Sequence, residues 1–375
     1  ALVNGCRSYK MGRWWRGCRA EHTQLSYFNI GNHRMTVSPD DDRPTPRAKV
    51  HPAFRLVTWL ITFGCFYLVY GRVEEAAARV DLTAVEYLIN FFREANWILW
   101  LSFMIPYSVF FFLVDAHATW RVIRWFNAPT IRLVNILPIR ASAYILSLVN
   151  EQVGKGAMSL YLYQRYRVPG WEAISSMILL GMVEIYQLLI FSAVGVTLYF
   201  DLIGEASTQL PLVNILMVVF AVALVYFPLH LLYFGGTLLP KSGIRDKPLL
   251  RAFRRARPLH YLLVLLFKAP NLLVAVMVYT AALDLFHVDV SFGQMLAFLP
   301  VIFLAAALPL PFHAGALLLW TVLFPEFPEV GAFSLVMHTF FVSFNAVIGL
   351  VFLPKANREL FVAESGETDE VVADT

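Results

Sequence analysis

Long apolar runs alternate with short polar segments along most of the chain. Six runs are long enough to cross a bilayer as α-helices, because a hydrocarbon layer about 30 Å thick needs about 20 mostly apolar residues. They cover approximately 54–71, 95–114, 173–200, 212–234, 259–287 and 331–353. Since lipid admits only helices or closed barrels, and the alternation typical of barrel strands is missing from the sequence, the pattern predicts an all-α polytopic membrane protein.

Two further apolar stretches are each interrupted near the middle. Residues 136–167 form two arms, 141–149 and 157–166, on either side of the polar tip 150–156. Ten helical residues cover about 15 Å, half of the hydrocarbon layer, so this stretch is expected to dip into the membrane and return. Residues 291–324 carry a similar break, Pro309–Gly315. Pro and Gly there disrupt the helix, which is tolerated at membrane depth only against protein or water.

The two predicted re-entrant hairpins occupy equivalent places between spans. One unit covers about 95–200 and the other about 259–354, each in the order span, hairpin, span. Their expected orientations are opposite, which predicts an inverted-topology repeat with a substrate site near the midplane. Two alternatives stay open: either hairpin could be two tilted full spans, or it could be buried packing with no role in transport.

The composition excludes one class of protein, and the distribution of charge sets the expected orientation in the membrane. The 375 residues are 58% hydrophobic and only 15% charged, against about 25% in soluble domains, which excludes a cytosolic globular enzyme. Of the 30 Lys and Arg residues, 26 lie in segments 1–55, 116–167 and 241–257 or after the last span. The positive-inside rule then predicts a multi-pass protein with both termini in the cytoplasm. We expect it in the bacterial inner membrane.

The chain ends differ from the membrane domain, which we expect to cover residues 51–356. Residues 1–50 are polar and basic and predict a disordered cytoplasmic leader. Met35 is a plausible natural start, so residues 1–34 could lie outside the native protein. Residues 357–375 predict an acidic cytoplasmic tail. Near the spans, the helical spacing of apolar residues in 85–92 predicts an amphipathic surface helix, and 120–126 a shorter one.

Ionisable groups at membrane depth are costly and therefore mark candidate functional sites. An anionic headgroup requires cations and free backbone N–H groups, which helix N-termini expected at Gly156 and Gly315 would supply. We interpret the two tips as a cradle for a phosphate-bearing headgroup, with Glu151 and Glu184 balancing charge or exchanging protons. The candidate substrate-binding residues are Arg140, Asn150, Glu151, Gln152, Lys155, Gly156, Glu184, Lys268, Asn271, His313 and Gly315.

A structural interpretation of the same residues also stays open. Glu184–Lys268 and Glu151–Lys155 could be buried ion pairs that hold helices together, and His313 could be an ordinary hydrogen-bonding residue. Common hydrolase, zinc and phosphate-loop motifs are missing from the sequence. The three cysteines do not form a metal-type cluster. We therefore assign no catalytic residues and expect no metal, no cofactor and no nucleic-acid partner.

The tips also carry a resemblance to a known family. The stretch Ala143–Asn150, Gly154, Tyr163-Gln164-Arg165 and Val168–Ala173 resembles the lysylphosphatidylglycerol synthase transmembrane region, a flippase-like domain that also occurs as a stand-alone membrane protein. Leu308–Gly315 is similar to the family's second Pro/Gly break. The resemblance covers roughly 130–360 and implies movement of a polar lipid between leaflets. Bifunctional members append a soluble aminoacyl-transfer domain that these residues lack, so we expect no lipid aminoacylation.

Three functional hypotheses follow from the sequence. The first is a transporter that moves an anionic or polar lipid between leaflets through a midplane site, with membrane lipids as its partners. The second is a membrane-embedded lipid-modifying enzyme, with Glu151 or Glu184 as general base. The third is a scaffold or regulator whose buried charges are structural. A transporter is favoured over an enzyme.

Overall fold

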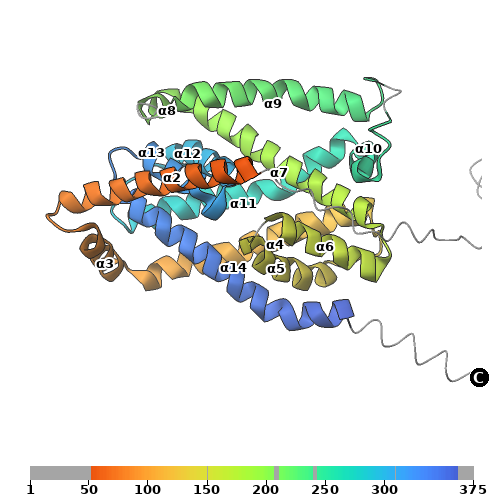
Figure 1. Cartoon of the computed structure of the whole chain (residues 1–375), viewed down its shortest axis with the longest axis horizontal. Helices are drawn as coiled ribbons and strands as arrows, with labels where there is room; N and C mark the ends of the chain where they lie inside the picture. The colour runs from red at the N-terminus through yellow and green to blue at the C-terminus, as the bar shows by residue number, and fades with distance from the viewer. Residues whose placement is uncertain (1–51, 150, 207–210, 240–242, 309, 362–375) are drawn as a thin grey trace, which may run out of the picture. The chain divides into compact units, whose positions relative to one another are not determined.

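The fold is entirely helical within the described residues. The computed structural model describes residues 52–149, 151–206, 211–239, 243–308 and 310–361, and none of these lies in a β-strand. Helices long and apolar enough to cross a membrane are α2 (Pro52–Ala78), α4 (Trp97–Phe126), α7 (Gly170–Leu198), α9 (Leu212–Phe234), α11 (Pro258–Asp284) and α14 (Val330–Phe361), drawn in Figure 1. The prediction of an all-α polytopic membrane protein is confirmed.

The first predicted hairpin has longer arms than the sequence pattern indicated. Helix α5 (Leu133–Val149) has 17 residues and α6 (Glu151–Tyr166) has 16. Each is therefore about 24–26 Å long, short of the roughly 30 Å hydrocarbon layer but more than half of it. Gly156 lies inside α6, so the expected helix N-terminus at Gly156 is wrong, and the helix begins at Glu151.

The second predicted hairpin is shorter. Helix α12 (Phe292–Ala306) is followed by the 3₁₀ turn η3 (Pro311–His313) and by α13 (Ala314–Leu323), which has 10 residues. Gly315 is the second residue of α13, in the first turn where it was expected. Phe312 and His313 both have positive φ, a conformation that non-glycine residues rarely adopt and that redirects the chain sharply before α13.

The helices pack as two units, and each unit places one of its shorter helices against a long helix of the other. Helix α5 of the first unit (α4–α7) packs against α14, and α12 of the second unit (α11–α14) packs against α7. Close contact is possible because a glycine lies at each crossing. A Cβ added to Gly195 would lie 2.6 Å from Cα of Ala297, and one added to Gly349 would lie 3.0 Å from the carbonyl oxygen of Ala141. Helices α4 and α11 pack against each other between these two crossings.

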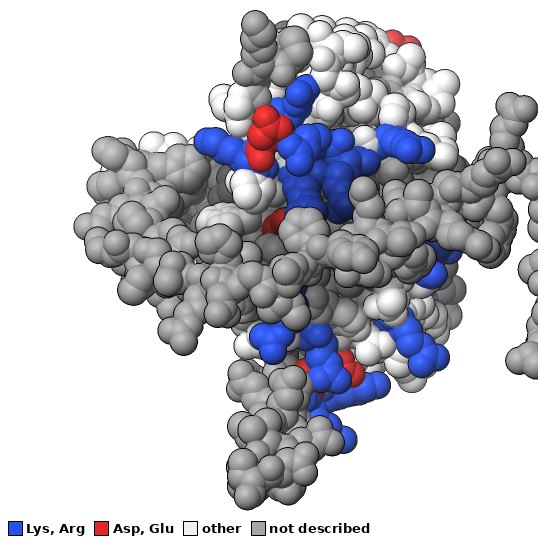
Figure 2. Space-filling view, turned by 90° about the vertical axis from the view of Figure 1, so that its right-hand side faces the viewer, with Lys and Arg blue, Asp and Glu red and all other residues white. Residues whose placement is uncertain are grey.

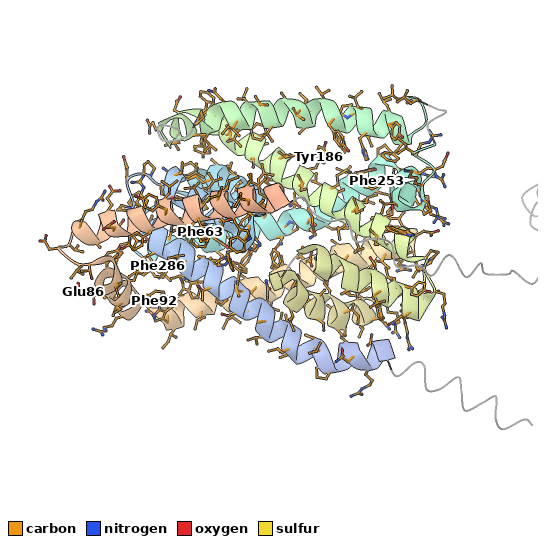
Figure 3. All side chains as sticks on the ribbon, viewed as in Figure 1. Phe63, Glu86, Phe92, Tyr186, Phe253 and Phe286 are labelled. Carbon is orange, nitrogen blue, oxygen red and sulfur yellow. The ribbon has the colours of Figure 1, made fainter. Side chains whose placement is uncertain are left out.

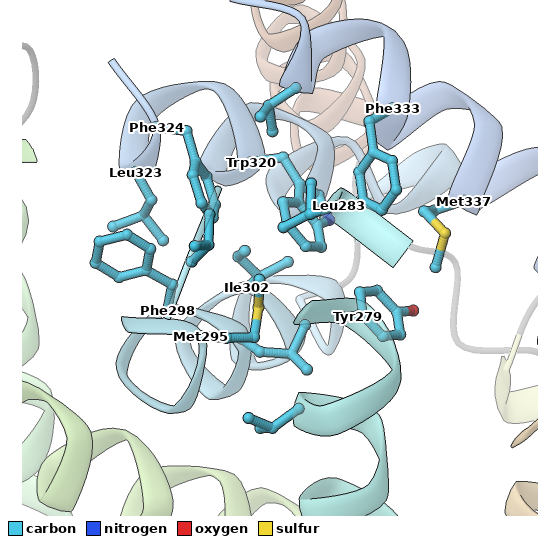
Figure 4. Close-up of a cluster of buried hydrophobic side chains, with 14 of the residues drawn as sticks. Tyr279, Leu283, Met295, Phe298, Ile302, Trp320, Leu323, Phe324, Phe333 and Met337 are labelled. Atoms are coloured by element: carbon cyan, nitrogen blue, oxygen red, sulfur yellow. The ribbon is translucent and has the colours of Figure 1, made fainter. Parts of the chain in front are cut away.

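The largest buried cluster lies where α11, α12, α13 and α14 meet (Figure 4). Trp320 is at its centre: its ring stacks 5.8 Å from that of Tyr279 and meets the ring of Phe333 edge-on at 5.5 Å. Met295 and Leu283 are fully buried in the same cluster. Trp100 near the start of α4 and Val196 near the end of α7 belong to the same cluster, so this packing holds the second unit against those helix ends.

Short helices complete the fold. They are α3 (Ala84–Glu94), α8 (Phe200–Ala206), the 3₁₀ turn η2 (Pro248–Leu250) and α10 (Arg251–Arg255). The predicted helix at 85–92 is present as α3, and Figure 3 shows Glu86 and Phe92 on it near Phe286. The capping box with Thr83 lowers the pKa of Glu86, because Thr83 donates from its N–H and hydroxyl groups to this carboxylate.

Several expected helix boundaries change. The span predicted to end at residue 114 continues to Phe126, so the separate surface helix expected at 120–126 is the last part of α4. Helix α14 continues to Phe361 and takes the first five residues of the predicted tail. The leader 1–50 and residues 362–375 lie outside the described residues.

Candidate functional site

A network of four ionisable side chains joins the two units. The carboxylate of Asp115, on α4, accepts from Nε of Arg140 at 2.6 Å and from Nζ of Lys268 at 2.6 Å. Lys268, on α11, also donates to Oε1 of Glu184, on α7. The hydroxyl of Tyr144, one turn after Arg140 on α5, donates to Asp115 at 2.8 Å. We call these five residues the charge network.

The network is electrically neutral and lies within the spans. Two carboxylates face two cations, which is the arrangement that makes charge tolerable where water is excluded. Asp115, Glu184 and Lys268 each lie at least ten residues from either end of an apolar helix of 27 or more residues. The network therefore lies at membrane depth rather than in a loop.

Accessibility differs strongly between the two carboxylates. Asp115 is 3% exposed and Lys268 8%, whereas Glu184 is 27% exposed. Asp115 accepts from three donors, while Lys268 is the one partner of Glu184 among the contacts of the described residues. Glu184 is therefore the member of the network that can leave most easily.

Three unpaired polar atoms of the spans lie on the same side of the charge network. Oδ1 of Asn271, Oγ of Ser108 and Oγ of Ser192 are buried and have no hydrogen-bond partner among the described residues. On α11, Asn271 is one turn after Lys268. On α4, Ser108 is two turns before Asp115, and on α7, Ser192 is two turns after Glu184. Since α4 runs opposite to α7 and α11, all three are displaced from the network in the same direction, away from α10. Buried polar atoms without partners are uncommon in folded proteins and favour ordered water or a ligand nearby.

The structure brings together three of the predicted site residues and separates others. Arg140, Glu184 and Lys268 are in the charge network, and Asn271 lies next to it. The predicted structural pair Glu184–Lys268 is present. His313 lies instead in η3, with its ring 5.6 Å from that of His338, and Gly315 is in contact with α12.

The first tip stays untested. Asn150 lies outside the described residues. Glu151, Gln152 and Lys155 belong to α6, but their side chains are outside the described part of the chain, so the pair Glu151–Lys155 and the shared chamber between the tips both stay predictions. Within the described residues, no group of three or more His, Cys, Asp and Glu side chains could hold a metal ion.

Sequence reasoning missed Asp115 and Tyr144. Asp115 was placed just beyond the end of its span, although no Pro or Gly follows it before residue 127 to end the helix. Continuing the helix to the next breaker would have put this carboxylate inside the membrane, where an unpaired charge is costly and a cation partner is expected.

The fold and the charge network define an all-α polytopic membrane protein with a neutral, buried ionic site between two helical units. No family model, curated protein or solved structure matches the chain. The resemblance to the flippase-like family therefore stays a hypothesis based on the residues of the two tips.

Proposed function

We propose that this protein is a membrane transporter of the flippase-like type that moves an anionic or polar lipid between leaflets. The observation that carries the proposal is the unequal sharing of Lys268 between a fixed carboxylate and a removable one. Asp115 is held by Arg140 and Tyr144 as well, whereas Glu184 depends on Lys268 and is partly exposed. Lys268 can therefore exchange one anion without losing the other.

The substrate's phosphate takes the place of Glu184 in this scheme. The ammonium group of Lys268 then pairs with the headgroup, while Asp115 keeps the lysine in position. Binding one negative charge would unbalance the network, and uptake of a proton by Glu184 restores neutrality. This step follows from the high cost of an uncompensated charge at membrane depth.

The arrangement of the two units supports a moving site. Asp115, Glu184 and Arg140 belong to the first unit and Lys268 to the second, so a shift of one unit against the other changes the distance between these partners. The unpaired oxygens of Ser108, Ser192 and Asn271 extend the polar surface from the network toward the α3 side. In the proposed transporter, the two helical pairs are re-entrant hairpins of an inverted repeat in a bacterial inner membrane.

The test is leaflet exchange of a fluorescent phosphatidylglycerol in proteoliposomes. Wild-type protein should raise the exchange rate at least about tenfold above empty vesicles. The variant Lys268→Met/Glu184→Gln keeps Asp115 opposite Arg140 and so retains a neutral network, but should lose the exchange. Thr280→Ala is the matched control, because the Thr280 hydroxyl bonds only a carbonyl of its own helix.

Three outcomes would contradict the proposal. No acceleration by folded wild-type protein would remove it. Full exchange by the neutral double variant would show that the charge network is structural, as the scaffold hypothesis predicts. A new covalent lipid product in the mass spectrum of the extracted lipids would favour the enzyme.

A further inference from the structure

A groove of about 450 Å³ lies between three of the apolar helices, and none of its lining residues belongs to the charge network. Helices α7, α9 and α11 line it with aliphatic and aromatic side chains, among them Ala193, Ala223, Phe227 and Leu262. Tyr186 lies between α7 and α9 (Figure 3), with its ring 4.9 Å from that of Phe227. The groove exists because α9 packs loosely: it has few buried residues, and large apolar side chains along it are exposed.

The length and position of the groove match one leaflet. Along α9 it extends from Phe220 to Leu231, about 16 Å of helix, or half of the hydrocarbon layer. Leu231 is three residues from the end of α9, and Pro258 is the first residue of α11. The groove therefore opens at the membrane surface at the ends of α9 and α11, on the side of α10.

Basic side chains border that opening. Arg257 directly precedes Pro258, and Figure 2 shows Lys and Arg gathered on the face where α10 lies. Arg251 pairs with Glu172, and Arg254 pairs with Asp246 at 2.6 Å. Lys247 and Arg257 are exposed and make no ion pair among the described residues. Arg257 is thus an unpaired cation directly beside an apolar groove one leaflet deep, and Lys247 is a second one just before η2 and α10.

We propose that this groove binds an anionic phospholipid, with an acyl chain between α7, α9 and α11 and the phosphate against Lys247 and Arg257. The apolar lining fits a hydrocarbon chain, and the unpaired cations favour an anionic headgroup over a zwitterionic one. This site is separate from the transport site, and its existence does not depend on transport.

The test is native mass spectrometry of the full chain released from micelles that contain dioleoylphosphatidylglycerol or dioleoylphosphatidylcholine. Wild-type protein should retain the anionic lipid preferentially. Lys247→Ala/Arg257→Ala should weaken retention of the anionic lipid by about 25-fold and leave the zwitterionic lipid unchanged. Lys355→Ala removes an exposed cation on α14 and is the charge control.

A second pair of variants tests the acyl chain. Ala223→Trp fills the groove and should reduce retention of both lipids, whereas Ala221→Trp, two residues away and outside the groove, should not. Equal retention of the two lipids by wild type, or equal losses in Ala221→Trp or Lys355→Ala, would overturn the proposal. So would a dimeric mass that Ala223→Trp converts to a monomer, because a second copy would then cover the groove.

Discussion

Asp115 and Glu184 show how two carboxylates in one network take different roles. The donors around Asp115 come from both units, so this residue ties α4 to α5 and α11 at once. Glu184 adds one contact at the edge of the network. Burial and partner number therefore predict that Asp115 stabilises the fold more than Glu184 does.

Substitutions at the two positions should separate these roles. Asp115→Asn leaves two cations facing one carboxylate and should lower the free energy of unfolding by about 3–5 kcal/mol, the usual effect of breaking a buried ion pair. Glu184→Gln should lower it by about 1–2 kcal/mol, because one partly exposed hydrogen bond to a charged group is weakened. The measurement is equilibrium unfolding in mixed micelles at increasing denaturing detergent. Equal losses would show that both acids are structural.

The sequence could predict most of the charge network because buried charges are rare in apolar spans. Glu184 and Lys268 stand out in this way, and their pairing was one of the two interpretations considered. Asp115 does not stand out, because a hydropathy window cannot distinguish the last turns of a span from the loop that follows. Tyr144 could not be recognised, since a tyrosine in an apolar helix has no distinguishing pattern until its acceptor is known.

At the scale of elements, two glycines lie where helices of the two units cross. Gly195 meets the backbone of α12, and Gly349 meets α5. Neither crossing could be predicted from sequence, because a glycine in an apolar helix gives no sign of which helix approaches it. The start of α6 was also mispredicted: glycines cost about 1 kcal/mol each in a helix, but burial of Met158 and Tyr161 against neighbouring helices outweighs that cost.

Adding a methyl group at the first crossing should destabilise the fold. In Gly195→Ala the new Cβ would lie 2.6 Å from Cα of Ala297 and 2.8 Å from the carbonyl oxygen of Leu296, so α7 and α12 must move apart. We expect a loss of about 1–3 kcal/mol, as for other overpacked sites. Gly64→Ala in α2 is the matched control, because its Cβ would meet nothing within 4 Å. It should be neutral or slightly stabilising in the same unfolding assay.

At the scale of the whole described domain, the connections gather at two opposite ends of the helices. At one end, Asn127 donates to the carbonyl of Glu172 and Arg255 to that of Phe126, which joins the ends of α4, α7 and α10. At the other end, Phe91 of α3 stacks 4.9 Å from Phe286 after α11, and Arg79 donates to the carbonyl of Glu326. This division agrees with the predicted separation of basic loops from acidic loops. It is the same whether the two predicted hairpins are re-entrant or cross the membrane fully, because two full spans also return the chain to its starting side.

Cysteine labelling in sealed vesicles can test both orientation and depth. After Cys6 and Cys18 are changed to Ser, Lys247→Cys should react from the cytoplasmic side and Glu86→Cys from the opposite side; Cys65 is buried. The decisive positions are Asn150→Cys, between α5 and α6, and Phe312→Cys in η3. A re-entrant first hairpin exposes position 150 only to the cytoplasmic side, and a re-entrant second hairpin exposes position 312 only to the opposite side.

Helix length predicts the labelling side firmly at position 312 but less firmly at position 150. Ten residues of α13 cover about 15 Å and reach only half of the hydrocarbon layer, so position 312 should label from the side of Glu86. The arms α5 and α6 are about 24–26 Å long, and a small local thinning of the bilayer would let them cross. Labelling of position 150 from the side of Glu86 would therefore show two full spans in the first unit, break the equivalence of the units, and remove the inverted repeat on which the proposed lipid pathway depends.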